Sequence, residues 1–177
     1  MSEDFFDAAA VGDGVAVRMS ANVAETLTHL AGELIRFLET GEVEPAKTGV
    51  FRRTVTAADV RRRMFPDAYR DRVEAEAFRE RHSGRLRDPS AARRVRQTLT
   101  GGTNHVLSRA QVGDWISTFG LARFLTLDRK SKRLGMVGSW VNHVQETLIL
   151  ATNVLAVPAD NPSPPQQTTS RVQRSEQ

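Results

Sequence analysis

The sequence predicts a mainly α-helical fold, a helical bundle of about five or six helices with a small N-terminal β-hairpin and a disordered C-terminal tail. Apolar residues recur at helical spacing through most of the 177-residue chain, and one alternating apolar run follows a Gly-Asp-Gly turn. The last twenty residues, PADNPSPPQQTTSRVQRSEQ, are polar and proline-rich, a composition that cannot bury enough apolar surface to fold. We therefore predict one domain over residues 1–157, which is long enough for a single core, and a tail over 158–177.

The N-terminal hairpin is predicted from the segment VGDGVAVRMS. Its Gly-Asp-Gly sequence favours a tight turn, and Val15, Val17 and Met19 alternate with other residues as in a strand with one buried face. We expect Phe5 and Phe6 in the first strand. From Ser20 the apolar period changes to that of a helix, capped by Ser20 or Asn22 and ending at Gly41. Its expected buried stripe is Val23, Leu27, Leu30, Leu34 and Phe37.

Two short helices are predicted in the middle of the chain, after a loop over residues 41–55. Thr56 and Asp59 have the spacing of a capping box, and Pro66 should end the helix that they open. The second helix is expected over 72–81, with Asp71 as its cap and a break at residues 82–84. The expected buried residues are Val60 and Met64 in the first helix, with Phe65 after it, and Val73, Ala77 and Phe78 in the second.

The remaining three helices show clearer signals. Asp88-Pro89 predicts a helix start, and Gly101-Gly102 the end of that helix, with Ala92, Val95 and Leu99 on its apolar side. Ser108 and Gln111 form a second capping-box pattern. The helix that they open has as its apolar face Val112, Trp115, Ile116, Phe119, Ala122 and Leu125. The last helix has a stripe of Val137, Val141, Val144, Leu148, Ala151 and Leu155.

Charge is distributed unevenly along the chain, although the net charge is only +4. Residues 1–51 carry nine acids against three bases, whereas residues 52–96 carry fourteen arginines against seven acids. This pattern indicates an anionic partner or attraction between the two parts within the fold. The candidate contacts with an anionic partner are Arg61, Arg62, Arg63, Arg93, Arg94 and Arg96. They are either phosphate contacts or solvated helix faces paired with the acidic N-terminal helix.

The residue types exclude several kinds of chemistry and point to no catalytic site. The chain has no cysteine, which excludes disulfides, thiolate catalysis and thiol redox switching. The segments Gly12-Asp13-Gly14 and Gly101-Gly102 match neither of the glycine motifs that bind phosphate groups. No serine or threonine has the sequence pattern of a nucleophile elbow. A helical metal site needs several carboxylates from different helices, and residues 115–159 contain only Asp128 and Glu146. We expect no enzyme activity, no metal and no cofactor.

The helix from Arg109 carries a second set of apolar residues off its main stripe, Leu121, Phe124 and Leu127. Such a helix is either central in the bundle or part of a homodimer interface, and both alternatives remain open. No apolar run is long enough to cross a membrane, and the acidic N-terminus does not have the pattern of a secretory signal. We therefore expect a cytoplasmic protein without membrane contact.

Several segments in order resemble the actinobacterial domain-of-unknown-function family 2017. They are VAVRMS, MFPDAY, RVRQTL, LSRAQVGDWI and SWVNHVQETL, which together extend over roughly residues 15–155. The resemblance implies a mainly helical fold with an N-terminal hairpin. It also implies genes near an adaptor of the Clp protease, and some members are described as oxidative-stress regulators of transcription. In that description a cysteine pair is the sensor, so the mechanism cannot operate in this cysteine-free chain.

Residue chemistry and resemblance together predict a non-enzymatic cytoplasmic regulator. It would act in transcription through DNA or through a transcription protein. The alternative is a protein-interaction or adaptor module linked to Clp-type proteolysis, with no DNA contact. We therefore expect a protein partner, and nucleic acid is the alternative partner.

Overall fold

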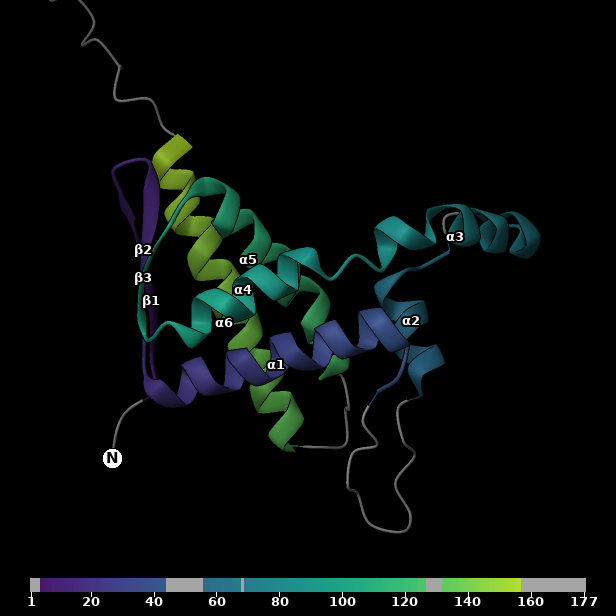
Figure 1. Cartoon of the computed structure of the whole chain (residues 1–177), viewed down its shortest axis with the longest axis horizontal. Coiled ribbons are helices and arrows are strands. Elements are labelled where there is room, and N and C mark those ends of the chain that lie inside the picture. The colour runs from purple at the N-terminus through teal and green to yellow at the C-terminus, as the bar shows by residue number, and fades with distance from the viewer. Residues whose placement is uncertain (1–3, 44–55, 68, 127–131, 157–177) are drawn as a thin grey trace, which may run out of the picture.

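The computed structural model describes residues 4–43, 56–67, 69–126 and 132–156. A small sheet stands at one end of the molecule, and all the labelled helices lie on one side of it (Figure 1). The mainly helical fold with an N-terminal hairpin is therefore confirmed. The predicted loop over 41–55 and the predicted tail lie almost entirely outside the described residues.

The sheet has three antiparallel strands in the order β1-β2-β3. The hairpin β1 (Phe6–Val11) and β2 (Gly14–Met19) is the predicted one, except that its first strand begins at Phe6 and leaves Phe5 outside. The third strand, β3 (Asn104–Leu107), was not predicted; it pairs with β2 so that Val17 lies opposite His105. Its partner lies more than eighty residues earlier in the chain, so no local pattern indicates the pairing.

Helix α1 (Ala21–Thr40) begins next to the sheet and runs away from it along the bundle (Figure 1). The Ser20 hydroxyl accepts a hydrogen bond from the Val23 amide at 3.4 Å and caps its start. At its end Gly41 adopts a φ of 74°, in the left-handed region that favours glycine. The predicted helix and its buried stripe are confirmed.

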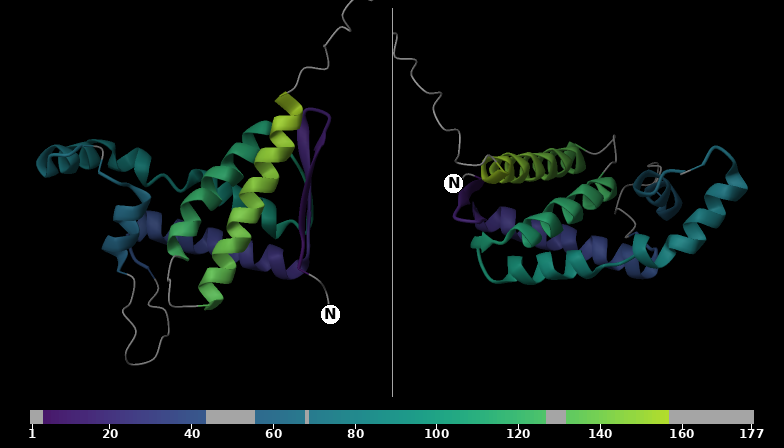
Figure 2. Two further views of the ribbon diagram at one scale, coloured as in Figure 1. Left: turned by 180° about the vertical axis from the view of Figure 1, so that it is seen from behind. Right: turned by 90° about the horizontal axis from the view of Figure 1, so that it is seen from above.

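Helices α2 (Ala57–Met64) and α3 (Arg72–Leu86) project away from the sheet (Figures 1 and 2). The predicted capping box of α2 is present, and Met64 is buried while Phe65 is half-buried. For α3 the predicted break at 82–84 is wrong, because the helix continues to Leu86.

The predicted buried face of α3 is also wrong. Val73 is 75% exposed and Ala77 is exposed, while Phe78 is half-buried and Ala75 is fully buried. The helix has little apolar contact with the bundle, so local capping by Asp71 decides where it begins: its carboxylate accepts bonds from the Val73 and Glu74 amides.

The other helices are α4 (Ser90–Thr100), α5 (Arg109–Ala122), a 3-10 turn η1 (Arg123–Leu125) and α6 (Lys132–Ala156). Helix α5 packs against α1, α4, α6, β2 and β3, so it is central in the bundle. Trp115 and Phe119 on α5 are fully buried, and their rings meet edge to face at 5.8 Å. The core therefore lies between the inner face of the sheet and the helices α1, α4, α5 and α6.

Among the described residues, no helix is long and apolar enough to cross a membrane. The same residues contain no group of three or more histidine or acidic side chains that could hold a metal ion.

Candidate functional site

The three arginines of α2 are all exposed at the end of the molecule away from the sheet. Arg61 turns toward the carboxyl end of α1. A Cβ added at Gly41 would lie only 2.9 Å from its Nη2 atom. Arg62 and Arg63 flank Asp59, whose pKa is lowered mainly by the hydrogen bond from the Thr56 hydroxyl and slightly by these two charges. The three arginines therefore form an exposed basic run on α2.

Two of the three α4 arginines form ion pairs within the fold. Arg93 contacts the Glu39 carboxylate on α1 at 2.5 Å. Arg94 makes two hydrogen bonds to the Asp114 carboxylate on α5, at 2.7 and 2.8 Å. These bonds favour the charged form and raise the pKa of Arg94. Both guanidiniums thus link α4 to its neighbours.

The third, Arg96, lies on a shallow groove between α1 and α4. Its guanidinium carbon would be 3.8 Å from a Cβ added at Gly32, so the charged group lies against the α1 backbone. The groove also carries Glu25, Glu33 and Arg36. Its mixed charges do not form a uniformly basic surface.

The predicted interface residues are used mostly within the bundle. Leu121 and Phe124 are half-buried and pack against the core. The Arg123 guanidinium lies 4.8 Å from the centre of the Phe124 ring, a cation–π contact. Leu127 lies outside the described residues. The observed position of α5 agrees with the alternative of a central helix.

The structure also forms a pocket that sequence reasoning missed, between the end of α1, α2 and the end of α3. We call it the arginine pocket; its lining is Phe37, Leu38, Gly41, Arg61, Phe65, Arg79, Leu86 and Arg87. Only Arg61 among these was a predicted site residue. The others come together through the packing of three helices, for which the sequence contains no local signal.

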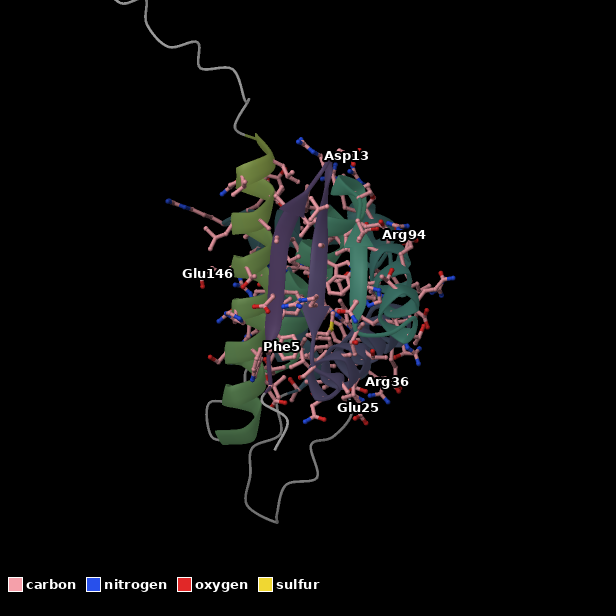
Figure 3. All side chains as sticks on the ribbon, turned by 90° about the vertical axis from the view of Figure 1, so that its left-hand side faces the viewer. Phe5, Asp13, Glu25, Arg36, Arg94 and Glu146 are labelled. Atoms are coloured by element: carbon pink, nitrogen blue, oxygen red, sulfur yellow. The ribbon has the colours of Figure 1, made fainter. Side chains whose placement is uncertain are left out.

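A second unpredicted surface is the outer face of the sheet, onto which Figure 3 looks. We call it the outer sheet face; it consists of Asp7, Ala9, Val11, Gly14, Ala16, Arg18, Asn104 and Val106. In Figure 3 no helix lies in front of the strands, and α6 stands beside β1.

Most of the outer sheet face is apolar. In the register of the sheet, Ala9, Ala16 and Val106 form one row across the three strands. Val106 is 71% exposed and Val11 is 50% exposed. Antiparallel sheets with one solvated face usually carry polar residues on that face. Here polar side chains are confined to one end, where Asp7 and Arg18 form an exposed ion pair at 3.6 Å.

Helix α6 also carries exposed apolar residues. It packs along β1, and its Leu150 and Val154, one helical turn apart, are 60% and 66% exposed. The sequence contains a weak signal for the outer sheet face: in a short strand such as Ala8-Ala9-Ala10-Val11, apolar residues point to both faces of the sheet. Without the position of β3 it does not show which face stays uncovered.

Fold and surfaces together define a mainly helical domain with an uncovered, largely apolar sheet face and a pocket lined by three arginines. The chain belongs to the family described as Domain of unknown function (DUF2017), whose model matches residues 6–152. No curated protein and no solved structure matches the chain significantly.

Proposed function

We propose that this protein is a non-enzymatic regulatory protein that acts by binding another protein through the outer sheet face. The observation that carries the proposal is the uncovered apolar row Ala9–Ala16–Val106. Contiguous apolar surface of this kind marks interaction sites in folded proteins. The small alanine side chains also let a partner approach the strands closely.

The ion pairs of α4 favour a protein partner over DNA. Arg93 and Arg94 are already paired with Glu39 and Asp114, so a phosphate there would compete with contacts within the bundle. DNA affinity depends on the number of phosphates that free cations can neutralise. Fewer free cations therefore reduce the affinity that this surface can supply.

The proposal is tested with two exposed valines at opposite ends of the molecule. Val106→Lys alters the outer sheet face, and Val73→Lys, at a valine that is 75% exposed on α3, is the matched control. Tagged wild-type protein and both variants are expressed in the native host, cross-linked and recovered, and the bound proteins are identified by mass spectrometry. We expect a partner held by wild type and Val73→Lys and lost from Val106→Lys.

The identity of the recovered protein distinguishes the finer hypotheses. A transcription protein supports a role in transcription regulation, and a component of a Clp-type protease supports the adaptor role. A second copy of this chain, visible as a dimer by light scattering that Val106→Lys dissociates, supports a homodimer through the same face. Recovery of the same proteins with all three forms would overturn the outer sheet face as the binding surface.

A second candidate function is DNA binding by a transcription regulator, which the exposed Arg61–Arg63 run favours. The test is fluorescence anisotropy of labelled duplex DNA, titrated from low to physiological salt. A variant with all three arginines changed to alanine is measured beside wild type. If the run contacts phosphates, affinity falls with salt and the variant shows a smaller slope, by roughly one per lost contact. No binding at low salt excludes this function.

A further inference from the structure

The arginine pocket has an apolar floor that remains accessible from solvent. Phe37 and Leu38 on α1 form its deepest part, each only 3% exposed. Half-buried Phe65 and Leu86 form its sides. The cavity measures about 60 Å³. It is much smaller than the roughly 300 Å³ or more of a typical small-molecule site, but it can accept one apolar side chain.

The rim of the pocket is basic. Arg61 comes from α2, Arg79 from α3, and Arg87 directly follows α3. Arg79 is paired with Asp67 at 2.7 Å. Among the residues that the structure describes, no acidic side chain lies within ion-pair distance of Arg61 or Arg87. Two guanidiniums are therefore available to a ligand.

The carboxyl end of α1 offsets part of this charge. Its last carbonyl groups carry roughly half a negative charge near Gly41. The lining itself contains no acid, and Asp67 together with this partial charge does not balance its three arginines, so the lining is positive. A pocket with an apolar floor and a positive rim complements a ligand that presents an apolar group between negative charges.

We propose that the arginine pocket binds an acidic peptide segment of a partner protein. One apolar side chain enters the pocket, and flanking carboxylates contact Arg61 and Arg87. Guanidinium groups bind carboxylates well because their paired donors match both oxygens. DNA has the negative charge but presents no apolar side chain to fill the floor. The site lies at the far end of α1 from the outer sheet face, so it stands whether or not that face binds a partner (Figure 1).

The test uses fluorescein-labelled peptides of sequence Asp-Glu-X-Glu-Asp and anisotropy. X is in turn Leu, Ile, Met, Phe, Tyr or Trp, with Ala at X as the control for the pocket and Lys-Lys-Leu-Lys-Lys as the control for charge. We expect at least one apolar X to bind at least about tenfold more tightly than Ala, and the basic peptide not to bind. Absence of binding by all six at about millimolar concentration overturns the proposal.

Charge variants distinguish peptide binding in the pocket from unspecific attraction between opposite charges. Arg61→Glu and Arg62→Glu make the same charge change at neighbouring exposed positions, but only Arg61 lines the pocket. We expect Arg61→Glu and Arg87→Glu each to weaken binding by about tenfold or more, and Arg62→Glu by less than about threefold. All three side chains are exposed, so the fold should tolerate each change. Far-UV circular dichroism and thermal melting check this directly.

Two further outcomes decide the proposal. Equal weakening by Arg62→Glu and Arg61→Glu, or equal affinity for the Ala and apolar peptides, would reduce the binding to unspecific charge attraction and overturn it. Val106→Lys should leave peptide affinity unchanged. Failure of peptide binding would thus leave the proposed function of the outer sheet face standing, and loss of that function would leave the pocket intact.

Discussion

The sheet end and the α2–α3 end of this molecule differ in how they are held together. At the sheet end, apolar stripes from α1, α4, α5 and α6 form one core with the inner face of the strands, and Val15 and Leu107 are fully buried. At the other end, α2 is anchored by Val60 and Met64, and α3 has Ala75 as its buried residue. The second region relies on caps, the Asp67–Arg79 ion pair and ring contacts such as Tyr69–Phe78.

This difference shows where stability and binding chemistry reside. Burial of apolar surface in the bundle supplies most of the free energy of folding. The α2–α3 region contributes less to stability and therefore tolerates exposed arginines around an apolar pocket. Substitutions at the two ends should consequently have different kinds of effect, global for the bundle and local for α2 and α3.

The largest effect is expected in the bundle. Leu148 on α6 is fully buried, and Leu148→Ala leaves a cavity in the core. We expect a loss of about 3 kcal/mol in the free energy of unfolding. Urea denaturation followed by circular dichroism measures it. As a control, Leu150→Ala removes the same atoms from an exposed position of the same helix and should change stability by less than about 0.5 kcal/mol.

A smaller and local effect is expected at Val60, the fully buried anchor of α2. Val60→Ala should weaken the attachment of α2 by about 1.5 kcal/mol, from the two methyl groups lost. Hydrogen exchange should show faster exchange in α2 and α3 with little change in α5. Uniformly faster exchange would mean that both ends of the molecule unfold together.

An opposite effect is expected at Thr118 on α5, whose hydroxyl is buried without a hydrogen-bond partner in the described structure. Thr118→Val removes this polar atom at nearly constant shape, so we expect stabilisation of about 1 kcal/mol. Thr126 is the control, since its buried hydroxyl donates to the Arg123 carbonyl at 2.8 Å. Thr126→Val should destabilise the protein. The melting temperatures of the two variants, each compared with wild type, test both expectations.

The smallest effect concerns pH and compares two capping boxes. At the N-terminus of α2, the capping box is completed by Asp59, whose pKa is lowered from 3.8 by hydrogen bonds from the Thr56 hydroxyl and amide. At the N-terminus of α5, the capping box is completed by the uncharged Gln111 side chain. A lowered pKa means that the folded state binds fewer protons, so the stabilisation is present above the ordinary value and lost as pH falls through the lowered one.

Acidification should therefore fray the start of α2 and leave the start of α5 intact. Carbon-13 Cα chemical shifts, followed from neutral pH to below about pH 3, measure helix content at each end. Asp59→Asn should make the start of α2 insensitive to pH in this range. Equal fraying of both helices would show that acid acts on the bundle as a whole.

Much of the framework could be predicted from the sequence. The starts of α1, α2 and α5 follow from Ser20, Thr56 and Ser108, because a cap involves groups only two or three residues apart. The helical stripes of α1, α4 and α6 were also identified from spacing alone. The burial of α3 was not, since its weak periodicity has meaning only relative to the elements that it contacts.

The candidate surfaces could be predicted only in part. Arg61 was predicted as a candidate contact for an anionic partner, whereas the other pocket residues Arg79, Arg87 and Leu86 were not. Arg93 and Arg94 were considered as phosphate contacts or as solvated partners of acids, and the fold places acids beside both. Such pairings join residues twenty or more positions apart, and charge patterns do not specify which acid meets which base.

The sequence by itself determined most of the helices, the caps of α1, α2 and α5, the hairpin and the absence of cysteine chemistry, because each depends on residues close together in the chain or on composition. The tertiary structure decided the pairing of β3 with β2, the exposure of Val106 and the assembly of the arginine pocket. These features depend on contacts between distant segments. Such contacts form only when the whole core packs, so no single stretch of sequence encodes them.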